Sequence, residues 1–362
     1  MKPYLEVLAD GRPVNGLFYS ALKSATIRDE AGQESDSFEV EFDDTAATIA
    51  LPREGTILSP SGGFRGRAVT RFGDFKVAGY ERGRTASEGR YIRMTARPAD
   101  LREDLKEPVS EHWDDQTLGG VLSELAERHG LVLAIDQELG SIKIPYLARV
   151  EQSAIDLVTR LADRYGATAK PAGGRLVFVK RGGTTASGQR LAPIVVRETD
   201  CSEWRIEAKP RPQFGGVRAG WLDREKGLRM EERADSGEGP FSMLRPLFAT
   251  KEEAQAAAQS KLTALTRATG SGSLTLSVGR PAARAEADLK LIGFGDGASG
   301  KWRATSVSHL FGGDGYQNSI DFEAAEEGRP KPGAGGGSDD NGAQAGGSDG
   351  GFADGFTGEE YL

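Results

Sequence analysis

The feature that most constrains the fold of this chain is a two-residue alternation of apolar and polar side chains. Residues 37–42 read Ser-Phe-Glu-Val-Glu-Phe, so every second side chain is apolar. Successive side chains of a strand point to opposite faces of a sheet, and the pattern therefore predicts a strand with one buried face. Residues 4–8, 56–58, 73–80 and 90–96 look similar, and Gly, Ser and Pro clusters separate them. Short strands at this spacing predict an antiparallel barrel or sandwich in the first hundred residues.

The pattern changes to helical spacing between residues 104 and 186. Residues 117–129 and 153–165 repeat apolar side chains at helical intervals, and each segment is followed by Gly and then an apolar strand. Gly130 and Gly166 stand where a helix commonly ends in a left-handed residue. The two helix ends, Leu-Ala-Glu-Arg-His-Gly and Leu-Ala-Asp-Arg-Tyr-Gly, form an internal repeat offset by 36 residues. We therefore expect a compact α/β domain with two related helix-strand units.

The strand pattern returns after residue 190 and continues to residue 322. One more helix is expected over residues 251–266, and Thr250 is a plausible N-cap for it. Residues 328–362 contain 12 of the 49 glycines and almost no aliphatic residues, which predicts a disordered tail. The outline from the residues alone is β, then α/β, then β again, then a Gly/Asp-rich tail.

Composition and charge narrow the classes of function. The 362 residues include 46 Lys+Arg and 54 Asp+Glu, a formal net charge of −8. The tail supplies −4 through two basic and six acidic residues, so residues 1–327 carry the other −4. A body this weakly acidic is not built to bind nucleic acid over its whole surface. With no apolar run of the roughly 18–20 residues that span a membrane and no signal-peptide layout, we expect a soluble cytoplasmic product.

Cysteine and histidine usage argues against a metal site. The lone Cys201 excludes an internal disulfide framework and a cysteine-based zinc site. The three histidines, His112, His129 and His309, do not cluster in the sequence. His129 precedes Gly130 at the end of an expected helix, where a cation favours the helix dipole, so we interpret it as a capping residue.

One short segment has residues suited to acid–base chemistry. Residues 111–115 read Glu-His-Trp-Asp-Asp, and a hydrolase could use two such carboxylates as acid and base. The alternative, which we favour, is a loop whose Asp115 caps a helix that starts near residue 116 or 117. Because no catalytic constellation emerges elsewhere, we assign no catalytic, cofactor-binding or metal-binding residue, and we expect neither a cofactor nor enzyme activity.

Two glycine-rich segments resemble motifs without the context that those motifs need. Residues 295–302 are close to a phosphate-binding P-loop, but Trp302 replaces the Ser or Thr that would reach magnesium. A strand pattern also follows, where a helix should begin, so we interpret the segment as a strand connection. Residues 346–350 match G-x-S-x-G, but that motif requires a turn between a strand and a helix, and this copy lies in the tail.

A basic segment extends from residue 64 to residue 102. It holds ten basic and four acidic side chains. On strands, such charges alternate with core positions and form a solvated or subunit-facing side, which is our main interpretation. A contact with an acidic protein partner and a nucleic-acid patch stay open as alternatives.

Several sequence stretches resemble the late control protein D family, the baseplate hub proteins of contractile phage tails. The first comprises Tyr-Leu-Ala-Arg-Val-Glu-Gln at 146–152 and Leu-Val-Thr-Arg-Leu-Ala-Asp-Arg-Tyr-Gly-Ala at 157–167, continuing through Lys-Pro-Ala-Gly-Gly-Arg-Leu-Val-Phe at 170–178. The second includes Trp-Arg-Ala at 302–304 and Val-Ser-His-Leu at 307–310. The order and spacing are similar to the family's over most of residues 1–325, while the first hundred residues match only in texture.

The resemblance implies a mainly β (α+β) fold with two antiparallel β-barrel domains and an inserted small α/β domain. It implies a non-enzymatic homotrimer whose two barrels per chain give a pseudo-sixfold ring between tail tube and central spike. Spike, tube and baseplate wedge proteins would be its partners, with no membrane and no sequence-specific nucleic acid. The location would be the virion tail baseplate, after assembly in the bacterial host cytoplasm. The expected segments are 1–103 (first barrel, completed by 190–235), 104–186 (α/β insertion), 236–327 (second barrel with one helix) and 328–362 (disordered tail).

Two other functions remain as alternatives to the hub. A cell-wall hydrolase of the tail tip would use the 111–115 segment. A carbohydrate- or cell-surface-binding module would stack aromatic rings on sugars. The aromatic residues here lie scattered at core-like strand positions, which disfavours this hypothesis, and Trp113 or Trp221 would have to carry it. In the tail, Phe352, Phe356 and Tyr361 are consistent with either a short docking motif or simple disorder.

Overall fold

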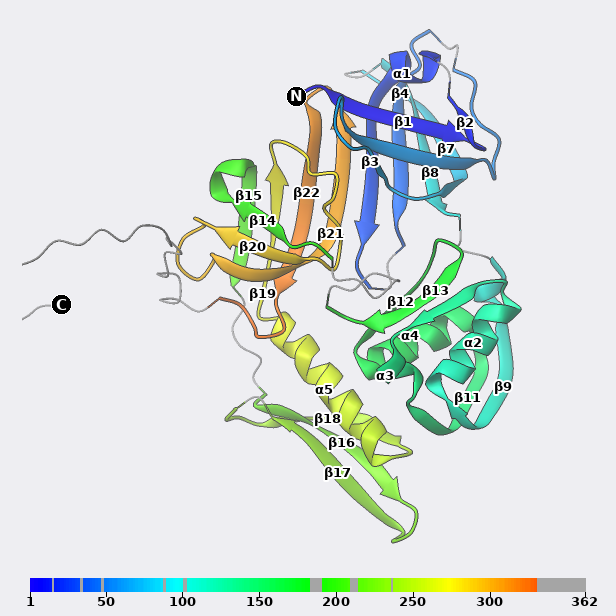
Figure 1. The fold of residues 1–362 in the computed structure, drawn as a ribbon, viewed down its shortest axis with the longest axis vertical. Coiled ribbons are helices and arrows are strands. Elements are labelled where there is room, and N and C mark those ends of the chain that lie inside the picture. The colour runs from blue at the N-terminus through cyan, green and yellow to red at the C-terminus, as the bar shows by residue number, and fades with distance from the viewer. Residues whose placement is uncertain are drawn as a thin grey trace, which may run out of the picture.

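The computed structural model describes residues 1–14, 16–32, 35–46, 49–86, 89–99, 103–182, 191–208, 214–235 and 237–330. Strands predominate in the described chain, and the helices α2 to α5 lie in its lower half, whereas α1 lies at the top (Figure 1). None of the helices in these ranges is long and apolar enough to cross a membrane. The expected disorder of the tail and its aromatic motif fall on residues 331–362, outside the described residues.

The N-terminal β region is built from antiparallel strands and one short helix. Its β4 confirms the alternation that the sequence predicts, because Phe38, Val40 and Phe42 are buried while Glu39 is exposed. Valine, isoleucine and phenylalanine side chains from the other strands complete this core. The elements are β1 (Pro3–Ala9), β2 (Arg12–Pro13), α1 (Gly16–Ala21), β3 (Leu22–Glu30), β4 (Ser37–Asp43), β5 (Ile57–Phe64), β6 (Thr70–Arg71), β7 (Phe75–Thr85) and β8 (Gly89–Pro98).

The α/β insertion forms a separate core beside this region. Thr117 and Ser153 cap its two longer helices, since each hydroxyl accepts a hydrogen bond from the backbone N–H three residues on. Gly130 and Gly166 have φ values of 60° and 63°, the left-handed conformation predicted for them. The elements are η1 (Glu103–Lys106), β9 (Pro108–Thr117), α2 (Leu118–Arg128), β10 (Val132–Ile135), α3 (Gln137–Gly140), β11 (Lys143–Ser153), α4 (Ala154–Tyr165), β12 (Ala167–Ala172) and β13 (Arg175–Lys180).

The C-terminal β region has its own core around Trp302, Val307 and Phe322. Its strands follow the order β15-β19-β22-β21-β20-β14, in which β14 is parallel to β20 and the other pairs are antiparallel. The elements are β14 (Ile194–Arg197), η2 (Glu198–Asp200), β15 (Cys201–Ala208), β19 (Gly270–Leu276), β20 (Asp288–Ile292), β21 (Gly300–Gly312) and β22 (Gly315–Ala324).

One long hairpin, β21–β22, belongs to both β regions. Its open end contributes Trp302 and Phe322 to the C-terminal core, and its turn end contributes Phe311 and Tyr316 to the N-terminal core. Strand β21 also pairs with β3 of the N-terminal region from Ser306 to Phe311. The two regions are therefore one continuous 14-stranded sheet.

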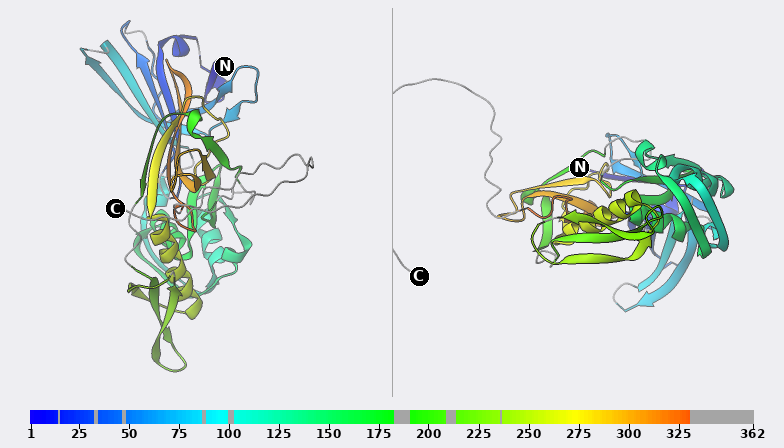
Figure 2. Two further views of the ribbon diagram at one scale, coloured as in Figure 1. Left: turned by 90° about the vertical axis from the view of Figure 1, so that its left-hand side faces the viewer. Right: turned by 90° about the horizontal axis from the view of Figure 1, so that it is seen from below.

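A separate three-stranded sheet lies at the far end of the molecule from the N-terminal β region (Figure 2). It comprises β17 (Leu228–Asp235), β16 (Gly216–Asp223) and β18 (Phe241–Phe248) in that order, and α5 (Lys251–Arg267) packs along one face. Thr250 caps α5 as predicted, and its hydroxyl accepts a hydrogen bond from the N–H of Glu253.

The strand pairings differ from two expectations. Residues 190–235 were expected to complete the N-terminal barrel, but β14 and β15 pair with β20 and β19 of the C-terminal region, while β16 and β17 belong to the separate sheet. The apolar positions of these strands would fit either core equally well. The sequence therefore does not predict which sheet each strand joins. The described strands of the 14-stranded sheet run from β15 at one edge to β2 at the other. These two edge strands do not pair with each other, so the described strands do not form a closed barrel.

Removal of one ring from the shared hairpin tests whether the two β regions unfold together. Phe322 is 2% exposed and packs edge-to-face on Trp302. We expect Phe322→Ala to lower the free energy of unfolding by about 3–5 kcal/mol in urea titrations, because it leaves a cavity. Amide hydrogen exchange in β3 should accelerate as well, although β3 belongs to the other region. Tyr80→Ala, at a ring 59% exposed on β7, is the control and should change stability by less than about 0.5 kcal/mol. Unchanged exchange in β3 would mean that the regions unfold separately.

Candidate functional site

The predicted acid–base segment, residues 111–115, lies on β9 and is divided between two faces of that strand. Trp113 is buried and its indole N–H donates to Glu124 at 2.8 Å, whereas His112 and Asp114 point to solvent with their side chains more than 60% exposed. His112 Nε2 lies 3.5 Å from Asp114 Oδ2. Strand alternation therefore places Glu111 on the face of β9 opposite His112 and Asp114.

Glu111 is held as a structural ion. Its carboxylate accepts hydrogen bonds from Arg149, at 2.8 Å, and from Arg128. Burial raises the pKa of Glu111, but the hydrogen bonds from the two guanidinium groups outweigh it, and the net pKa lies below its usual value. Arg149 is 2% exposed and also donates to the carbonyls of Gln152 and Glu107. A carboxylate fixed in this way stays ionised and cannot serve as a general acid at neutral pH.

The helix that follows starts differently from the prediction. Thr117, rather than Asp115, caps α2, and the chain before it is a strand instead of a loop. Asp115 itself has φ of 48°, a left-handed conformation that Asp tolerates better than most residues. His129 is the C-cap residue of α2, as predicted, and its Nδ1 lies 2.9 Å from Asp104 Oδ2.

The P-loop-like segment is a connection between strands, as predicted. It joins β20 to β21, and Trp302 is 1% exposed in the C-terminal core, where its indole N–H donates to the carbonyl of Ala298 at 2.8 Å. The G-x-S-x-G segment at 346–350 lies outside the described residues. Within the described ranges, no group of three or more His, Cys, Asp or Glu residues could hold a metal ion.

The basic segment 64–102 covers β6 to β8 and the surrounding turns, with residues 87, 88 and 100–102 outside the description. Some of its cations have partners within the chain, since Arg93 pairs with Glu41 at 3.0 Å and Arg71 with Asp74 at 2.5 Å. Arg84 near the hairpin end is exposed. The segment is thus a charged surface in this chain, and a contact with an acidic partner stays a prediction.

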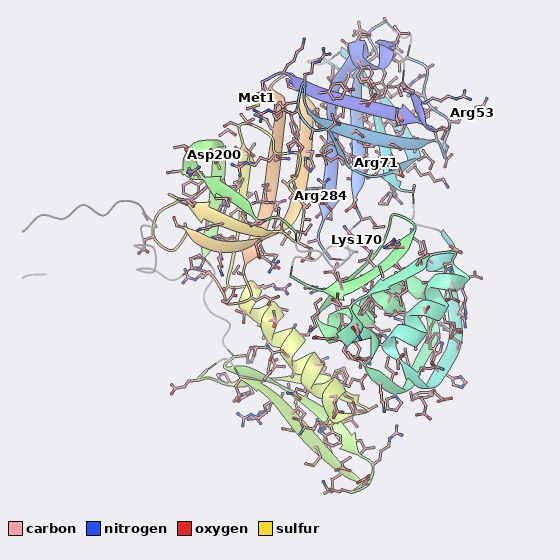
Figure 3. All side chains as sticks on the ribbon, in the orientation of Figure 1. Met1, Arg53, Arg71, Lys170, Asp200 and Arg284 are labelled. Carbon is pink, nitrogen blue, oxygen red and sulfur yellow. The ribbon has the colours of Figure 1, made fainter. Side chains whose placement is uncertain are left out.

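A charged cluster at the junction of the insertion and the N-terminal β region was not found from the sequence. Lys170 of β12 reaches across to Asp29 of β3 and to Asp36, at 3.5 and 3.4 Å, and donates to the carbonyl of Glu30 at 3.1 Å (Figure 3). Burial lowers the pKa of Lys170, but the two carboxylates outweigh it and the net pKa is raised. Lys170 is more than 130 residues away in sequence from both carboxylates, so no local pattern marks the cluster.

Further polar contacts hold the insertion to the C-terminal half of the chain. Arg164 of α4 pairs with Glu253 of α5, and the Ser260 hydroxyl of α5 donates to the carbonyl of Asp163 at 2.6 Å. The Thr168 hydroxyl donates to Glu286 at 2.9 Å. Together with Lys170, these contacts position the insertion against both β3 and α5.

A buried polar centre lies where the shared hairpin passes between the two cores. The His309 side chain is fully buried, and its Nδ1 is 2.7 Å from the Tyr316 hydroxyl and 3.0 Å from Asn318 Nδ2. Its Nε2 lies 3.4 Å from Nη1 of Arg284, a guanidinium group that can only donate, so the contacts of the ring favour its neutral form. Burial, and secondarily the Arg284 guanidinium, lower the pKa of His309 to about 3. The centre is therefore neutral and structural at physiological pH.

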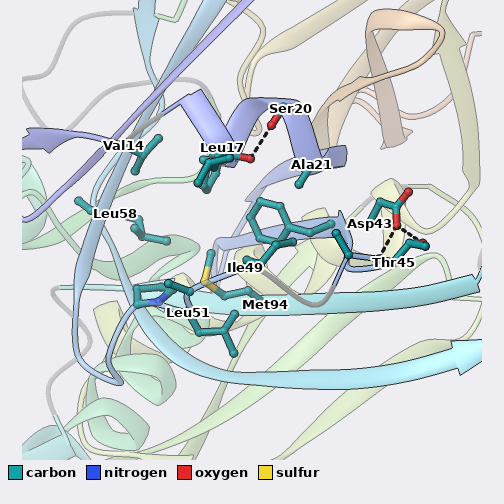
Figure 4. Close-up of a pocket in the computed structure, with 16 residues that line it drawn as sticks. Val14, Leu17, Ser20, Ala21, Asp43, Thr45, Ile49, Leu51, Leu58 and Met94 are labelled. Atoms are coloured by element: carbon teal, nitrogen blue, oxygen red, sulfur yellow. Dashed lines mark hydrogen bonds between the residues drawn. The ribbon is translucent and has the colours of Figure 1, made fainter.

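An apolar pocket of about 680 Å³ lies under α1 at the end of the N-terminal β region. Phe18, Ile49, Leu58 and Met94 are among its lining residues (Figure 4). Its one carboxylate, Asp43, accepts two hydrogen bonds from Thr45, which lower the pKa of Asp43. The pocket thus offers contact for apolar groups and no converging acid–base pair.

Comparison with known proteins shows the family to which this chain is similar. The sequence pattern of the phage tail baseplate hub (GPD) family matches residues 68–315. The chain belongs to the phage tail baseplate hub family. It is a structural hub protein of a tail, as the resemblance in the sequence implied.

Individual relatives agree with the family over most of the chain. The probable baseplate hub protein of Escherichia phage P2 is 29% identical, over 89% of this chain and 93% of its own. The 43 kDa tail protein of prophage MuSo2 from Shewanella oneidensis has a similar fold, with a TM-score of 0.66, 14% identity and coverage of 90% of this chain and 99% of its own. The E. coli c3393 protein, a type VI secretion component described as similar to the T4 tail proteins gp27 and gp5, gives a TM-score of 0.50, 10% identity and coverage of 92% and 79%.

The buried histidine gives the hub protein a defined acid sensitivity. The folded-state pKa of His309 is below its unfolded value near 6.5, so its contribution is fully present above pH 6.5 and is lost as the pH falls toward 3. We expect the free energy of unfolding to fall more steeply below pH 6 than in His309→Gln, with a slope difference approaching 1.4 kcal/mol per pH unit. Urea titrations from pH 7 to pH 4 measure this difference. His112→Gln, at an exposed strand position, should follow the unmodified profile; equal slopes for all three proteins would contradict the assignment.

The junction cluster should contribute to stability through its single cation. Lys170→Met leaves Asp29 and Asp36 facing each other at a largely buried junction, and we expect a loss of about 1–3 kcal/mol in the free energy of unfolding. Thermal unfolding followed by circular dichroism measures the loss. Lys180→Met is the matched control, because its ion pair with Glu138 is solvent-exposed and should contribute much less to stability. Equal losses in both variants would show that the junction cluster has no special role.

Proposed function

We propose that this hub protein forms a homotrimeric ring that joins the tail tube to the central spike of a contractile phage tail or a related particle. The observation that carries the proposal is the shared β21–β22 hairpin, which fixes two β regions of one chain in a set relation. Three chains would then supply six β regions. Such a ring could match a sixfold tube on one side and a threefold spike on the other.

Each β region would act as one barrel-like unit of the ring. In this proposal, residues 1–103 form the first unit and residues 104–186 the insertion. The second unit combines β19 to β22, within residues 236–327, with β14 and β15, because these two strands pair with β20 and β19. Sheet edges left unpaired in one chain would be covered in the ring, as symmetric assembly commonly does.

The relatives support the choice of partners. The c3393 protein is described by its similarity to gp27 and gp5 of the T4 tail, and the Escherichia phage relative is a probable baseplate hub protein. By analogy, we propose the tail spike, tail tube and baseplate wedge proteins as the partners of this chain. The chain would be placed in the virion baseplate after assembly in the cytoplasm of the bacterial host.

We further propose that the chain is not an enzyme and binds no cofactor. The segment 111–115, the one candidate for hydrolase chemistry, has its first acid held by Arg128 and Arg149, while Asp114 is exposed on the opposite face of β9. This arrangement supports a structural role for the segment. It gives no support to the cell-wall hydrolase that the sequence left open.

The oligomeric state tests the ring directly. The full chain, purified alone and then mixed with the spike and tube proteins of its own particle, should sediment as a trimer and as larger complexes that contain three copies. Sedimentation velocity at micromolar concentration, with mass photometry of the mixtures, measures the copy number. A stable monomer in the presence of both partners would refute the ring, whereas the family membership would stand.

A further inference from the structure

The small sheet of β16, β17 and β18 has two unlike faces. One face is covered by α5, where Val217, Ala219 and Phe248 pack against the alanines of the helix. In a sheet, residues that pair directly across two strands point to the same face, and successive residues of one strand point to opposite faces. The residues that alternate with Val217 and Ala219, together with their partners on β17 and β18, therefore lie on the face away from α5. We call this the outer sheet face, and it consists of Arg218, Leu222, Arg229, Glu231, Arg233, Asp235, Phe241, Met243 and Leu247.

Two glycines shape this face. A Cβ atom on Gly216 would come within 2.5 Å of the Phe241 ring, and one on Gly220 within 3.0 Å of Arg229 Nε. Neither glycine has a positive φ, so their backbone conformation does not require glycine. Glycine is needed at these positions because a side chain would collide with its neighbours. The Phe241 ring and the Arg229 guanidinium group therefore lie close against β16.

The centre of the outer sheet face combines a ring with cations. The guanidinium carbons of Arg218 and Arg233 lie 4.6 and 4.2 Å from the centre of the Phe241 ring. The nearby carboxylates, Glu231 and Asp235, are 4.0 and 3.6 Å from these guanidinium groups, which is at the outer range of an ion pair. These cations are therefore incompletely neutralised within the described chain.

Apolar side chains border this centre. Leu222, Met243 and Leu247 are 40%, 41% and 53% exposed. Exposed apolar groups that adjoin arginines are typical of a surface that binds a partner. The chemistry that fits is a peptide that carries both carboxylates and aromatic rings.

The segment 331–362 of this chain has that chemistry. It contains six acidic residues and one lysine, and its last part carries Phe352, Phe356 and Tyr361. The described chain ends beside the last turn of α5, where the N–H of Arg329 donates to the Thr269 hydroxyl at 3.3 Å. The 22 residues from Pro330 to Phe352 span about 26 Å as a flexible chain, comparable to the ~25 Å length of α5, so the segment can reach the sheet that α5 carries.

We propose that residues 331–362 dock on the outer sheet face of their own chain. The aromatic side chains would pack on Phe241, Met243 and Leu247, and the carboxylates would pair with the three arginines. The docked segment covers the apolar part of the face. This interaction is independent of the trimeric ring and of its partners.

Amide hydrogen exchange of the full chain tests the proposal. The comparison is between the unmodified chain and a variant with Phe352→Ser, Phe356→Ser and Tyr361→Ser. We expect peptides covering β16 and β18 to exchange at least threefold faster in the variant, with the N-terminal β region unchanged. The difference should shrink when sodium chloride is raised from 50 to 500 mM, because salt screens the ion pairs.

A second variant tests the other side of the contact. Arg218→Glu with Arg233→Glu should give the same loss of protection in β18, whereas Arg84→Glu, at an exposed arginine of the distant β7, should not. Because the tail variant alters none of the described residues, it keeps the test valid if the double arginine variant unfolds. Identical exchange of β16 and β18 with and without the aromatic residues would overturn the proposal. Protection that disappears on dilution would assign the tail to another copy and overturn docking within one chain.

Discussion

The packing of one hairpin into two cores is the constraint on which the rest of this fold depends. β21 and β22 bury Trp302 and Phe322 at one end and Phe311 and Tyr316 at the other. Because the same two strands pair with β3, β19 and β20, neither β region can shift its register without disturbing the other. The buried His309 centre lies within this hairpin, so a polar network without charge on its imidazole fills the place where the two cores meet.

Polar contacts join the insertion both to this frame and to α5, which carries the small sheet. Each has a separate apolar cluster, and the contacts between units involve Lys170, Arg164 and Ser260. Contacts of this kind specify orientation, because charged partners must meet at particular positions. They are also more sensitive to pH and salt than the apolar hairpin. The hub protein therefore combines an apolar frame with units that charge holds in place.

The local elements were the part that the sequence predicted best. The alternation in β4, the glycines that end α2 and α4, and the Thr250 cap follow from short-range rules that need no tertiary information. The partners of β14 and β15 could not be predicted, since an alternating strand fits any sheet that offers a matching face. The cap of α2 was assigned two residues early because Asp and Thr are both good caps.

At the candidate site, too, the sequence predicts local features but not the contacts between distant segments. That Glu111 and Asp114 lie on opposite faces follows from strand alternation, but the segment looked like a loop because its polar residues are crowded together. The Lys170 and His309 clusters could not be found in advance: their members come from different strands and the insertion, and a lone lysine or histidine carries no local signal. Family resemblance supplied the function that the residues alone could not.

The hairpin also affects how the protein would resist force when it lies between other components of a tail. The hydrogen bonds of an antiparallel ladder run perpendicular to its strands. A pull directed along β21 and β22 would stress the whole ladder in shear, so that many bonds share the load at once. A pull across the strands would open the bonds one after another. The protein is thus strongest along the axis that links its two halves.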